Sequence, residues 1–437
     1  MNRFNNYIIK NNYFDLPIVG IEPSCLLTFS DEYQSLKGVK NRDKIKNKFY
    51  FPSSNPIYLC GHSLGLQPKQ TYNYVKDELN AWEELGVEGH LNGKSPWLDY
   101  HSYLAENMSK IVGANTSEVV VMNSLTTNLH LLMISFFKPT KQKFKILIDT
   151  PSFPSDKYAV QSQLKLHGLN PLEDLIEVST FKDNKCISNK DMLNQIEANL
   201  DNVAMMLISG VNYYTGQFYD LKSISDLAKQ NNCMIGLDLA HAAGNVQLEL
   251  HSWDIDFAAW CGYKYLNGGP GAPSGVFVNE RYHSSNLNRL EGWWGHDRET
   301  RFSPPDLFNP IKSAEAWQLS NPPILSMAAL RSSIELFDSV GMDTLRKRSK
   351  LLTSYMENMI CSINNSNINI ITPSDSRDRG SQLSLAIHSD EKNIELFLKN
   401  KNIICDFRKP NVIRAAPCAF YNSYKDIYNF VQVLKEL

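Results

Sequence analysis

Short apolar runs alternate with longer amphipathic segments through the middle of the chain. Each run is bounded by glycine or polar residues, which is typical of a buried strand in an α/β sheet. The predicted strands are Val119–Met122, Lys145–Asp149, Ala204–Ser209, Met234–Asp238, Phe257–Cys261 and Gly275–Val278. The predicted helices between them are Thr126–Phe137, Ser155–Leu166 and Leu221–Asn231. This alternation predicts a mostly parallel sheet with helices on both faces.

The N-terminal part of the chain departs from that rhythm. Residues 1–55 are polar with scattered aromatics and predict an N-terminal arm, after which a short strand leads into a glycine-containing turn over residues 57–66. A helix follows from Pro68 through Trp82, and another helix, Tyr100–Val112, stops at a glycine.

The C-terminal third begins with a long irregular stretch, about residues 283–325. A loop of this length inside a compact protein is more often functional than idle. Helices dominate from there to about residue 365, and strands return at Gln382–Ile387 and Val412–Arg414, which predicts a smaller α/β domain. We therefore expect three units: an N-terminal arm (1–55), a large domain (56–325) and a small C-terminal domain (326–437).

Composition narrows the class of protein. The chain has 437 residues, of which 43% are hydrophobic and 21% charged, an ordinary globular composition with room for two or three domains. A net charge of -2 argues against a dedicated nucleic-acid or anionic-membrane surface. No window is long and apolar enough for a membrane span, and the N-terminus lacks the apolar core of a secretion signal. We expect a cytoplasmic protein that acts on a small molecule.

The eight cysteines are scattered and form no CxxC pair. This spacing argues against both a disulfide framework and a zinc site, and no histidine pair suggests another metal centre. The sequence also lacks the GxxxxGK[ST] and GxGxxG nucleotide-binding motifs. We therefore expect no metal, and the candidate chemistry lies elsewhere.

An acid and a lysine follow two neighbouring predicted strands. Asp238 closes the run Met234–Asp238, and Lys264 follows the run Phe257–Cys261 inside WCGYKYLNGGPG. Pyridoxal-phosphate enzymes use a lysine amine to form a Schiff base with the cofactor aldehyde and a carboxylate to keep the pyridine nitrogen protonated. Taken alone, a helix-capping Asp and a surface Lys are the better explanations. Together, and beside a glycine-rich segment, the two residues favour a cofactor site at the carboxyl ends of the strands.

Three further segments are compatible with that site. The turn Asn123–Thr127 joins a strand to a helix, where backbone N–H groups favour a phosphate, although an ordinary Ser or Thr cap explains it equally well. Phe153 could stack on a flat cofactor ring and Asp156 could bond to it, or the segment could be a Pro-initiated turn. Tyr263 could contact a phosphate or donate a proton, or could be a half-buried strand aromatic.

Arg414 ends an apolar strand in the C-terminal tail. The guanidinium of an arginine at such a place suits a fork-shaped bond to a carboxylate, although a surface arginine is the simpler explanation without other support.

The strings that contain these residues resemble one family, kynureninase, a pyridoxal-phosphate hydrolase of the aspartate-aminotransferase type. The resemblance runs from about residue 55 to 430. It rests on GHSLGLQPK, NSLTTNLHLLM, FPSD, GLDLAHAAGNVQLELHSWDIDFAAWCGYKYLNGGPG, GWWGH, SNPPIL and IRAAP. It implies an α/β fold of the pyridoxal-phosphate-dependent transferase type (fold type I), with a large cofactor domain and a smaller C-terminal α/β domain. It also implies a homodimer whose active sites are built at the subunit interface.

The resemblance implies roles for individual residues. Lys264 would form the Schiff base, Asp238 would pair with the pyridine nitrogen, and Tyr263 would donate a proton during catalysis. Arg414 would bind the substrate carboxylate. The implied pyridoxal-phosphate contacts are Leu125, Thr126, Phe153, Pro154, Ser155, Asp156, Ser209, Asp238, His241, Tyr263, Lys264, Trp293 and Asn321.

The implied reaction is the hydrolytic cleavage of the Cβ–Cγ bond of L-kynurenine or 3-hydroxy-L-kynurenine. Its products are anthranilate or 3-hydroxyanthranilate and L-alanine, in tryptophan catabolism and NAD biosynthesis. Ser63, His90 and Asn321 match the branch of the family that prefers the 3-hydroxylated substrate, whose hydroxyl needs hydrogen-bond partners. A cysteine desulfurase or an aminotransferase of the same fold is the first alternative, and a scaffold that has lost catalysis is the second.

Overall fold

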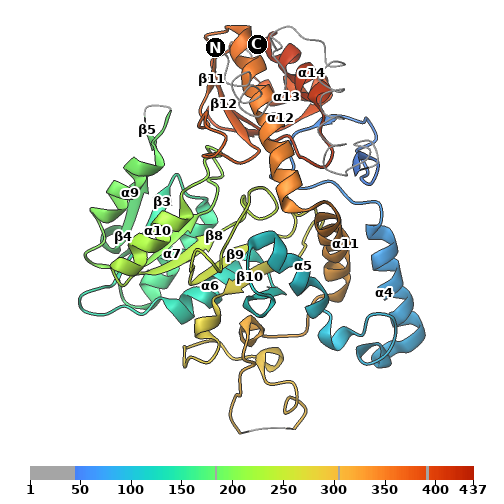
Figure 1. Cartoon of the computed structure of the whole chain (residues 1–437), viewed down its shortest axis with the longest axis vertical. Helices are drawn as coiled ribbons and strands as arrows, with labels where there is room; N and C mark the ends of the chain where they lie inside the picture. The colour runs from blue at the N-terminus through green and yellow to red at the C-terminus, as the bar shows by residue number, and fades with distance from the viewer. Residues whose placement is uncertain (1–44, 183–184, 304–305, 390–392) are drawn as a thin grey trace.

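The computed structural model describes residues 45–182, 185–303, 306–389 and 393–437. Residues 1–44 of the predicted N-terminal arm lie outside the described residues. A seven-stranded sheet forms the centre of the large domain (Figure 1). In spatial order its strands are β2 (Val119–Met122), β10 (Ser274–Val278), β9 (Phe257–Trp260), β8 (Met234–Asp238), β7 (Val203–Ser209), β3 (Lys145–Thr150) and β4 (Leu175–Ser179).

The predicted mostly parallel sheet is confirmed. The neighbouring strands from β9 to β4 all pair in parallel, whereas β10 runs antiparallel to both β9 and β2. The edge strand β4 was not predicted, because only one of its five residues is buried and its apolar pattern is weak.

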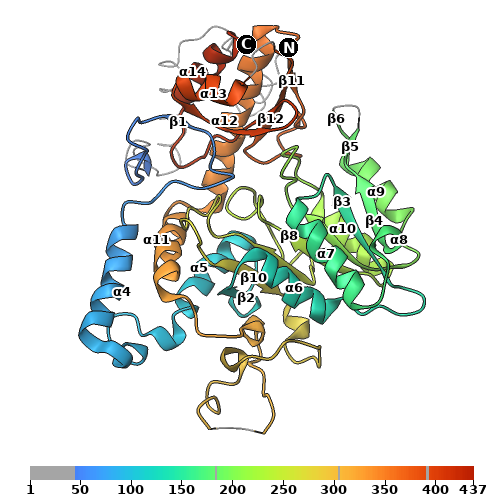
Figure 2. The same cartoon turned by 180° about the vertical axis from the view of Figure 1, so that it is seen from behind.

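Helices cover both faces of this sheet, as Figures 1 and 2 show from opposite sides. Successive strand residues point to opposite faces. Val120 packs in the core beneath α6 (Leu125–Phe136) and α7 (Pro154–Leu166), and Val121 packs in the core beneath α5 (Ser102–Val112) and α10 (Leu221–Gln230). The large-domain helices are α4 (Thr71–Leu85), α5 (Ser102–Val112), α6 (Leu125–Phe136), α7 (Pro154–Leu166), α8 (Pro171–Asp174), α9 (Asn189–Glu197), α10 (Leu221–Gln230) and α11 (Ile324–Val340).

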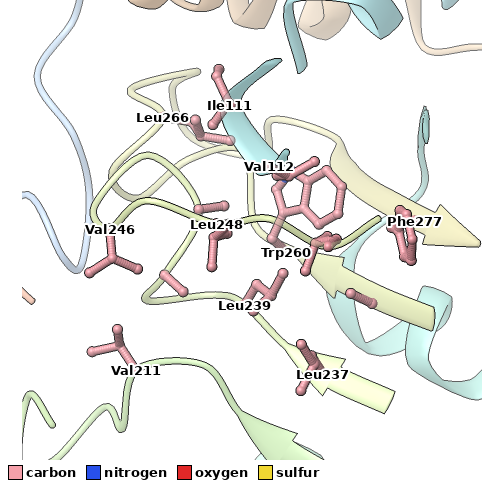
Figure 3. Close-up of a cluster of buried hydrophobic side chains, with 14 of the residues drawn as sticks. Ile111, Val112, Val211, Leu237, Leu239, Val246, Leu248, Trp260, Leu266 and Phe277 are labelled. Carbon is pink, nitrogen blue, oxygen red and sulfur yellow. The ribbon is translucent and has the colours of Figure 1, made fainter. Parts of the chain in front are cut away.

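In the larger of the two cores, residues of the strands and of the segments that follow them pack against residues of α5. Trp260 of β9 lies beside Val112 of α5 (Figure 3), and Ile111, Leu237 of β8 and Phe277 of β10 belong to the same core. All five side chains are at most 3% exposed. Packing of this kind fixes the carboxyl ends of β8 and β9, where the candidate site lies.

The small domain contains a four-stranded antiparallel sheet at the top of Figure 1. Its strands, in spatial order, are β11 (Ile368–Ile370), β12 (Leu383–Ile387), β15 (Val412–Ala415) and β14 (Asp406–Arg408). Its helices are α12 (Met342–Ile363), α13 (Ile394–Asn400) and α14 (Tyr424–Leu434). The early strand β1 (Ile57–Tyr58) also joins this domain by pairing in parallel with β13 (Ile403–Ile404).

The two cores divide the chain differently from the predicted boundary at residue 325. Buried residues of α11, such as Leu330, pack in the large core, and so does Leu345 at the start of α12. The small core begins at Leu351, and it also takes in Leu59 from the other end of the chain. The long helix α12 therefore passes from one core to the other.

The stretch between β10 and α11 is irregular, as predicted, and contains only short 3-10 turns among its described residues. They are η4 (Glu280–Tyr282), η5 (Trp293–Gly295) and η6 (Ala314–Trp317). The stretch hangs below the sheet in Figure 1. The other short elements are η1 (Gly86–His90), η2 (Trp97–Asp99), η3 (Thr116–Glu118) and the hairpin of β5 (Phe181–Lys182) and β6 (Lys185–Cys186). Among the helices described, none has the length and apolar character to cross a membrane.

Candidate active site

A cavity of about 500 Å³ opens at the carboxyl ends of β7 and β8 and at the N-terminus of α6. This is where open α/β sheets bind ligands. Most of the residues predicted for the cofactor site share it. Its lining includes Ser63, Leu125, Thr126, Phe153, Ser155, Ser209, Tyr213, Asp238, His241, Tyr263 and Lys264.

The amine of Lys264 lies at the buried end of this cavity. Its Nζ is 3.2 Å from Nε2 of His241 and 5.6 Å from the ring centre of Phe153. Burial, and then the charge of Lys264, lower the pKa of His241 well below its usual range, so this imidazole is neutral. Lys264 is therefore a mostly buried amine beside a neutral imidazole.

A glycine allows the turn over residues 61–66 to pack closely against the backbone of the lysine segment. The N–H of Gly65 donates to the carbonyl oxygen of Tyr263 at 2.9 Å. A side chain at this position would place its Cβ 2.5 Å from the carbonyl oxygen of Lys264. The turn that contains Ser63 can therefore press directly on the lysine segment because residue 65 has no side chain.

Two carboxyl groups meet on the other side of the lysine. Asp238, at the end of β8, accepts a hydrogen bond from the N–H of Ala240 at 2.8 Å. Asp156 lies in the first turn of α7, and its Oδ1 has no partner among the described residues. Burial, and then the neighbouring Asp238, raise the pKa of Asp156 well above its usual range. The nearby Lys264 amine lowers the pKa of Asp156 less than burial and Asp238 raise it, and a protonated ring nitrogen is a further cation that fits the pair.

The N-terminus of α6 forms another wall. Ser124 precedes the helix without capping it through its side chain, so the first N–H groups of α6 remain available. Thr126 Oγ1 lies 2.8 Å from Ser155 Oγ, which adds two hydroxyls at the same place. Backbone N–H groups and hydroxyls at a helix N-terminus suit a phosphate. Lysine, paired carboxyls and this wall together fit pyridoxal phosphate.

Arg414 lies beside the cavity and is 1% exposed. Its Nε and Nη2 bind the two oxygens of Asp406 at 3.0 and 2.8 Å, and its Nη1 donates to the carbonyl oxygen of Tyr213 at 2.6 Å. The ring of Tyr213 lines the cavity and meets Phe153 edge-on at 5.4 Å. The arginine is therefore rigidly held next to the cofactor wall rather than at the surface.

Six predicted residues do not line this cavity: Asp156 and Arg414, which lie beside it, and four that lie elsewhere. Pro154 is exposed and opens α7 at its first position. Trp293 is 49% exposed, and Asn321 is also exposed in the single chain. His90 lies in η1, where its ring meets Trp97 edge-on at 5.4 Å.

Two residues of the site were not predicted from the sequence. Tyr213 lies four residues beyond the end of β7, and the rule that ligands bind beyond strand ends could have indicated it. Asp406 binds Arg414 across the β14–β15 pair. No sequence signal marks Asp406, because its partner is defined only by strand register.

Two family descriptions match the chain. The one described as kynureninase C-terminal domain matches residues 345–434, and the one described as aminotransferase class I and II matches residues 71–257. The first begins close to the point where α12 passes into the small domain.

Curated relatives match over most of the chain. A kynureninase of Myxococcus xanthus is 48% identical over 395 residues, 89% of this chain and 93% of the relative. A kynureninase of Flavobacterium psychrophilum is 44% identical over 94% of this chain and 99% of the relative. One from Nematostella vectensis is 39% identical over 90% of both chains.

Solved structures with a similar fold are more distant in sequence. The cystine C-S lyase C-DES in complex with cysteine persulfide has a TM-score of 0.75 at 14% identity, and covers 88% of this chain and 98% of its own. The apo cysteine desulfurase of Thermococcus onnurineus has a TM-score of 0.71 at 16% identity, covering 90% and 97%. These likenesses establish the fold alone.

Proposed function

The chain belongs to the kynureninase family, and from that membership we propose how its residues cleave the Cβ–Cγ bond of a kynurenine by hydrolysis. The enzyme is a pyridoxal-phosphate-dependent hydrolase that releases L-alanine and an anthranilate. The observation that carries the residue assignment is the position of the Lys264 amine, which shares a cavity with Asp238 and a helix N-terminus, while Asp156 lies next to Asp238.

We propose that Lys264 holds the cofactor as a Schiff base. Asp238, with Asp156 beside it, would pair with the pyridine nitrogen, and Phe153 would lie against the ring. The N-terminus of α6, with Thr126, would hold the phosphate. When bound, the cofactor supplies an electron sink for the charge that develops at the substrate carbons.

The other steps belong to side chains of the cavity. Lys264, released by the incoming amine, removes the α-proton, and the neutral His241 can accept a hydrogen bond from the resulting ammonium. Water adds to the γ-carbonyl before the bond breaks. Burial, and then Cys261, raise the pKa of Tyr263, so its phenol keeps its proton at neutral pH and can deliver it to the Cβ carbanion.

Arg414 is proposed to bind the α-carboxylate of the substrate. A guanidinium has five N–H donors, and three of them bind Asp406 and the Tyr213 carbonyl. Two donors, one on each terminal nitrogen, remain for a carboxylate. Asp406 fixes the plane in which they point, because it binds the opposite edge of the guanidinium.

We also propose a preference for 3-hydroxykynurenine. Ser63 lines the cavity and can bond a ring hydroxyl. His90 and Asn321 lie outside the cavity of a single chain, and the exposure of Trp293 and Asn321 is what a second subunit would cover. A homodimer whose partner completes the site accounts for all three positions. The proposal extends to a cytoplasmic enzyme of tryptophan catabolism and NAD biosynthesis.

The desulfurase alternative has little support despite the likeness in fold. A desulfurase needs a mobile, reactive thiol, and the two candidates were Cys405 and Cys418. Burial raises the pKa of Cys418 to about 11 and raises that of Cys405 further. A protonated thiol is a poor nucleophile.

Two experiments test the proposal. Lys264→Ala and Lys264→Arg should lose the cofactor absorbance band and turnover together, whereas Lys157→Ala, in an exposed ion pair with Glu177, should retain both. A fully active Lys264→Ala enzyme would refute the assignment. Separately, kcat/KM for L-kynurenine and for 3-hydroxy-L-kynurenine should favour the hydroxylated substrate, and Ser63→Ala should reduce the ratio. A preference for kynurenine would retain the reaction and remove the proposed hydroxyl pocket.

A further inference from the structure

A second buried histidine lies behind the cavity and has no role in the steps above. His62 is 0% exposed, and neither ring nitrogen has a partner among the described residues. Buried polar atoms nearly always have a hydrogen-bond partner, in the protein or in an ordered water. A fully buried imidazole with both nitrogens unpaired therefore indicates that a small polar molecule belongs at this place.

The neighbours of His62 connect the cavity to the small domain. On one side its ring lies 6.2 Å, centre to centre, from the ring of His241, whose Nδ1 is also unpaired. On the other side a ring nitrogen of His62, the Cys60 thiol and an oxygen of Asp406 lie within 4.8 Å of one another. His241 in turn contacts the Lys264 amine at 3.2 Å.

The ring separation is too long for a direct hydrogen bond between the two imidazoles. One buried water between them would supply a partner for an unpaired nitrogen on each ring. We propose that His241, this water and His62 form a proton relay between Lys264 and the Asp406 carboxylate. The inference rests on the proposed function, because it requires Lys264 to take the α-proton of the substrate.

The transfer balances with both rings neutral before and after it. The Lys264 ammonium gives a proton to Nε2 of His241, while Nδ1 of His241 releases one to the water and so to His62. His62 releases a proton from its other nitrogen to Asp406, whose side chain is 13% exposed and passes a proton on to solvent. The reverse sequence carries a proton from solvent through Asp406 back to Lys264. Burial, and then nearby cations, lower the pKa values of both histidines, which favours neutral rings.

A metal ion is a poor occupant of the same cluster. The positive charges of Arg414, Lys264 and Arg408 lower the pKa of His62, and the two arginines already pair with the Asp406 carboxylate. Burial, and then Asp406, raise the pKa of the Cys60 thiol to about 11, so this sulfur is protonated at neutral pH. An electropositive pocket with a neutral thiol repels a dication, whereas a water molecule meets no such barrier.

The relay predicts how the α-hydrogen of the substrate exchanges with solvent while the substrate fills the cavity. With α-deuterated kynurenine in ordinary water, the wild-type enzyme should release L-alanine that has lost most of its label. His62→Phe should retain severalfold more deuterium at the alanine Cα, measured by mass spectrometry, because Lys264 would return the proton it removed.

A matched pair of variants separates the relay from a structural role. His62→Gln keeps a polar side chain that can bond the water but cannot pass a proton through a ring. The His62→Gln enzyme should be as stable as the wild type, and its L-alanine product should retain as much deuterium as that of His62→Phe. His283→Gln removes a buried histidine that instead bonds the Val278 carbonyl at 3.0 Å, and it should exchange like the wild type.

A measurement on the cofactor-free protein supplies an independent readout. In nitrogen-15 spectra, His62→Phe should change the tautomer signals of His241, which His241→Gln would identify, while His283→Gln should leave them unchanged. Equal label retention in wild type and both His62 variants, or complete retention in the wild type, would overturn the relay. Wild-type turnover by Lys264→Arg would instead overturn the proposed function, so the two failures are distinguishable.

Discussion

Asp406 offers a sharp test of the carboxylate site because it touches Arg414 but not the cavity. The two residues face each other across β14 and β15, with charge-assisted hydrogen bonds of 3.0 and 2.8 Å. Each such bond contributes about 1.5–3 kcal/mol net. Removing the carboxylate leaves the 2.6 Å bond to Tyr213 as the main restraint on the guanidinium.

We expect Asp406→Ala to raise KM for kynurenine about 10- to 100-fold, which corresponds to about 1.4–2.8 kcal/mol. The lower bound reflects replacement of one lost bond by water. Because the substrate carboxylate is charged before and during the reaction, the loss is uniform and kcat should change little. The KM of Asp406→Asn should lie between those of the wild type and Asp406→Ala, since an amide oxygen can still accept one of the two hydrogen bonds.

Steady-state kinetics on cofactor-loaded protein, at matched cofactor occupancy, measures this split between KM and kcat. Glu436→Ala is the control, because it breaks an exposed ion pair with Lys401 in the same domain, and such pairs contribute under about 1 kcal/mol. An unchanged KM for Asp406→Ala would refute the positioning role. A lowered KM would refute it more strongly, since Asp406 would then compete with the substrate for Arg414.

Three further predictions concern the scaffold. Gly65→Ala should weaken cofactor binding, because the added Cβ would lie 2.5 Å from the Lys264 carbonyl oxygen. Titration of the protein with the cofactor measures the affinity, and an unchanged affinity would show that the turn can move. Trp317→Ala should lower the free energy of unfolding by about 3–5 kcal/mol, because the side chain is 1% exposed. Denaturant melts measure this loss, and a loss under about 1 kcal/mol would contradict the packing. Glu315 has a pKa lowered to about 2, because hydrogen bonds from His101 and a neighbouring arginine outweigh the effect of burial. The carboxylate stabilises the fold above its unfolded pKa of about 4.5 and loses this effect as pH falls toward 2, so the melting-temperature gap to Glu315→Gln should narrow from pH 5 to pH 3.

The central sheet could be predicted because its strands are buried on both faces. Runs such as Val119–Met122 and Phe257–Trp260 are wholly apolar, and each is bounded by polar residues or glycine. The strand β4 could not be predicted in this way, because only one of its five residues is buried. The direction of β10 could not be predicted either. A short, mostly apolar strand such as β10 has no direction of its own in the sequence, so its antiparallel pairing depends on connections that only the folded chain defines.

The candidate site could likewise be predicted in part from the sequence. Asp238 and Lys264 could be paired from the sequence because one closes a strand and the other follows the next strand, and the carboxyl ends of parallel strands meet at one edge. Arg414 was predicted as a residue, but its environment was not. Its partners Asp406 and Tyr213 come from a neighbouring strand and from another domain, and neither local pattern nor spacing relates them.

The boundary between the domains bears on how the site is assembled. Tyr213 and Tyr214 belong to the large domain, yet their carbonyl oxygens accept hydrogen bonds from Arg414, Gln382 and Ser384 of the small domain, at 2.6 to 3.0 Å. The ring of Tyr213 then meets Phe153, the proposed cofactor partner. A substrate carboxylate bound at Arg414, as proposed, would therefore act on the same backbone segment that positions the aromatic wall. The C-S lyase and desulfurase structures share the fold of this chain, but chemistry is determined by side-chain contacts of this kind.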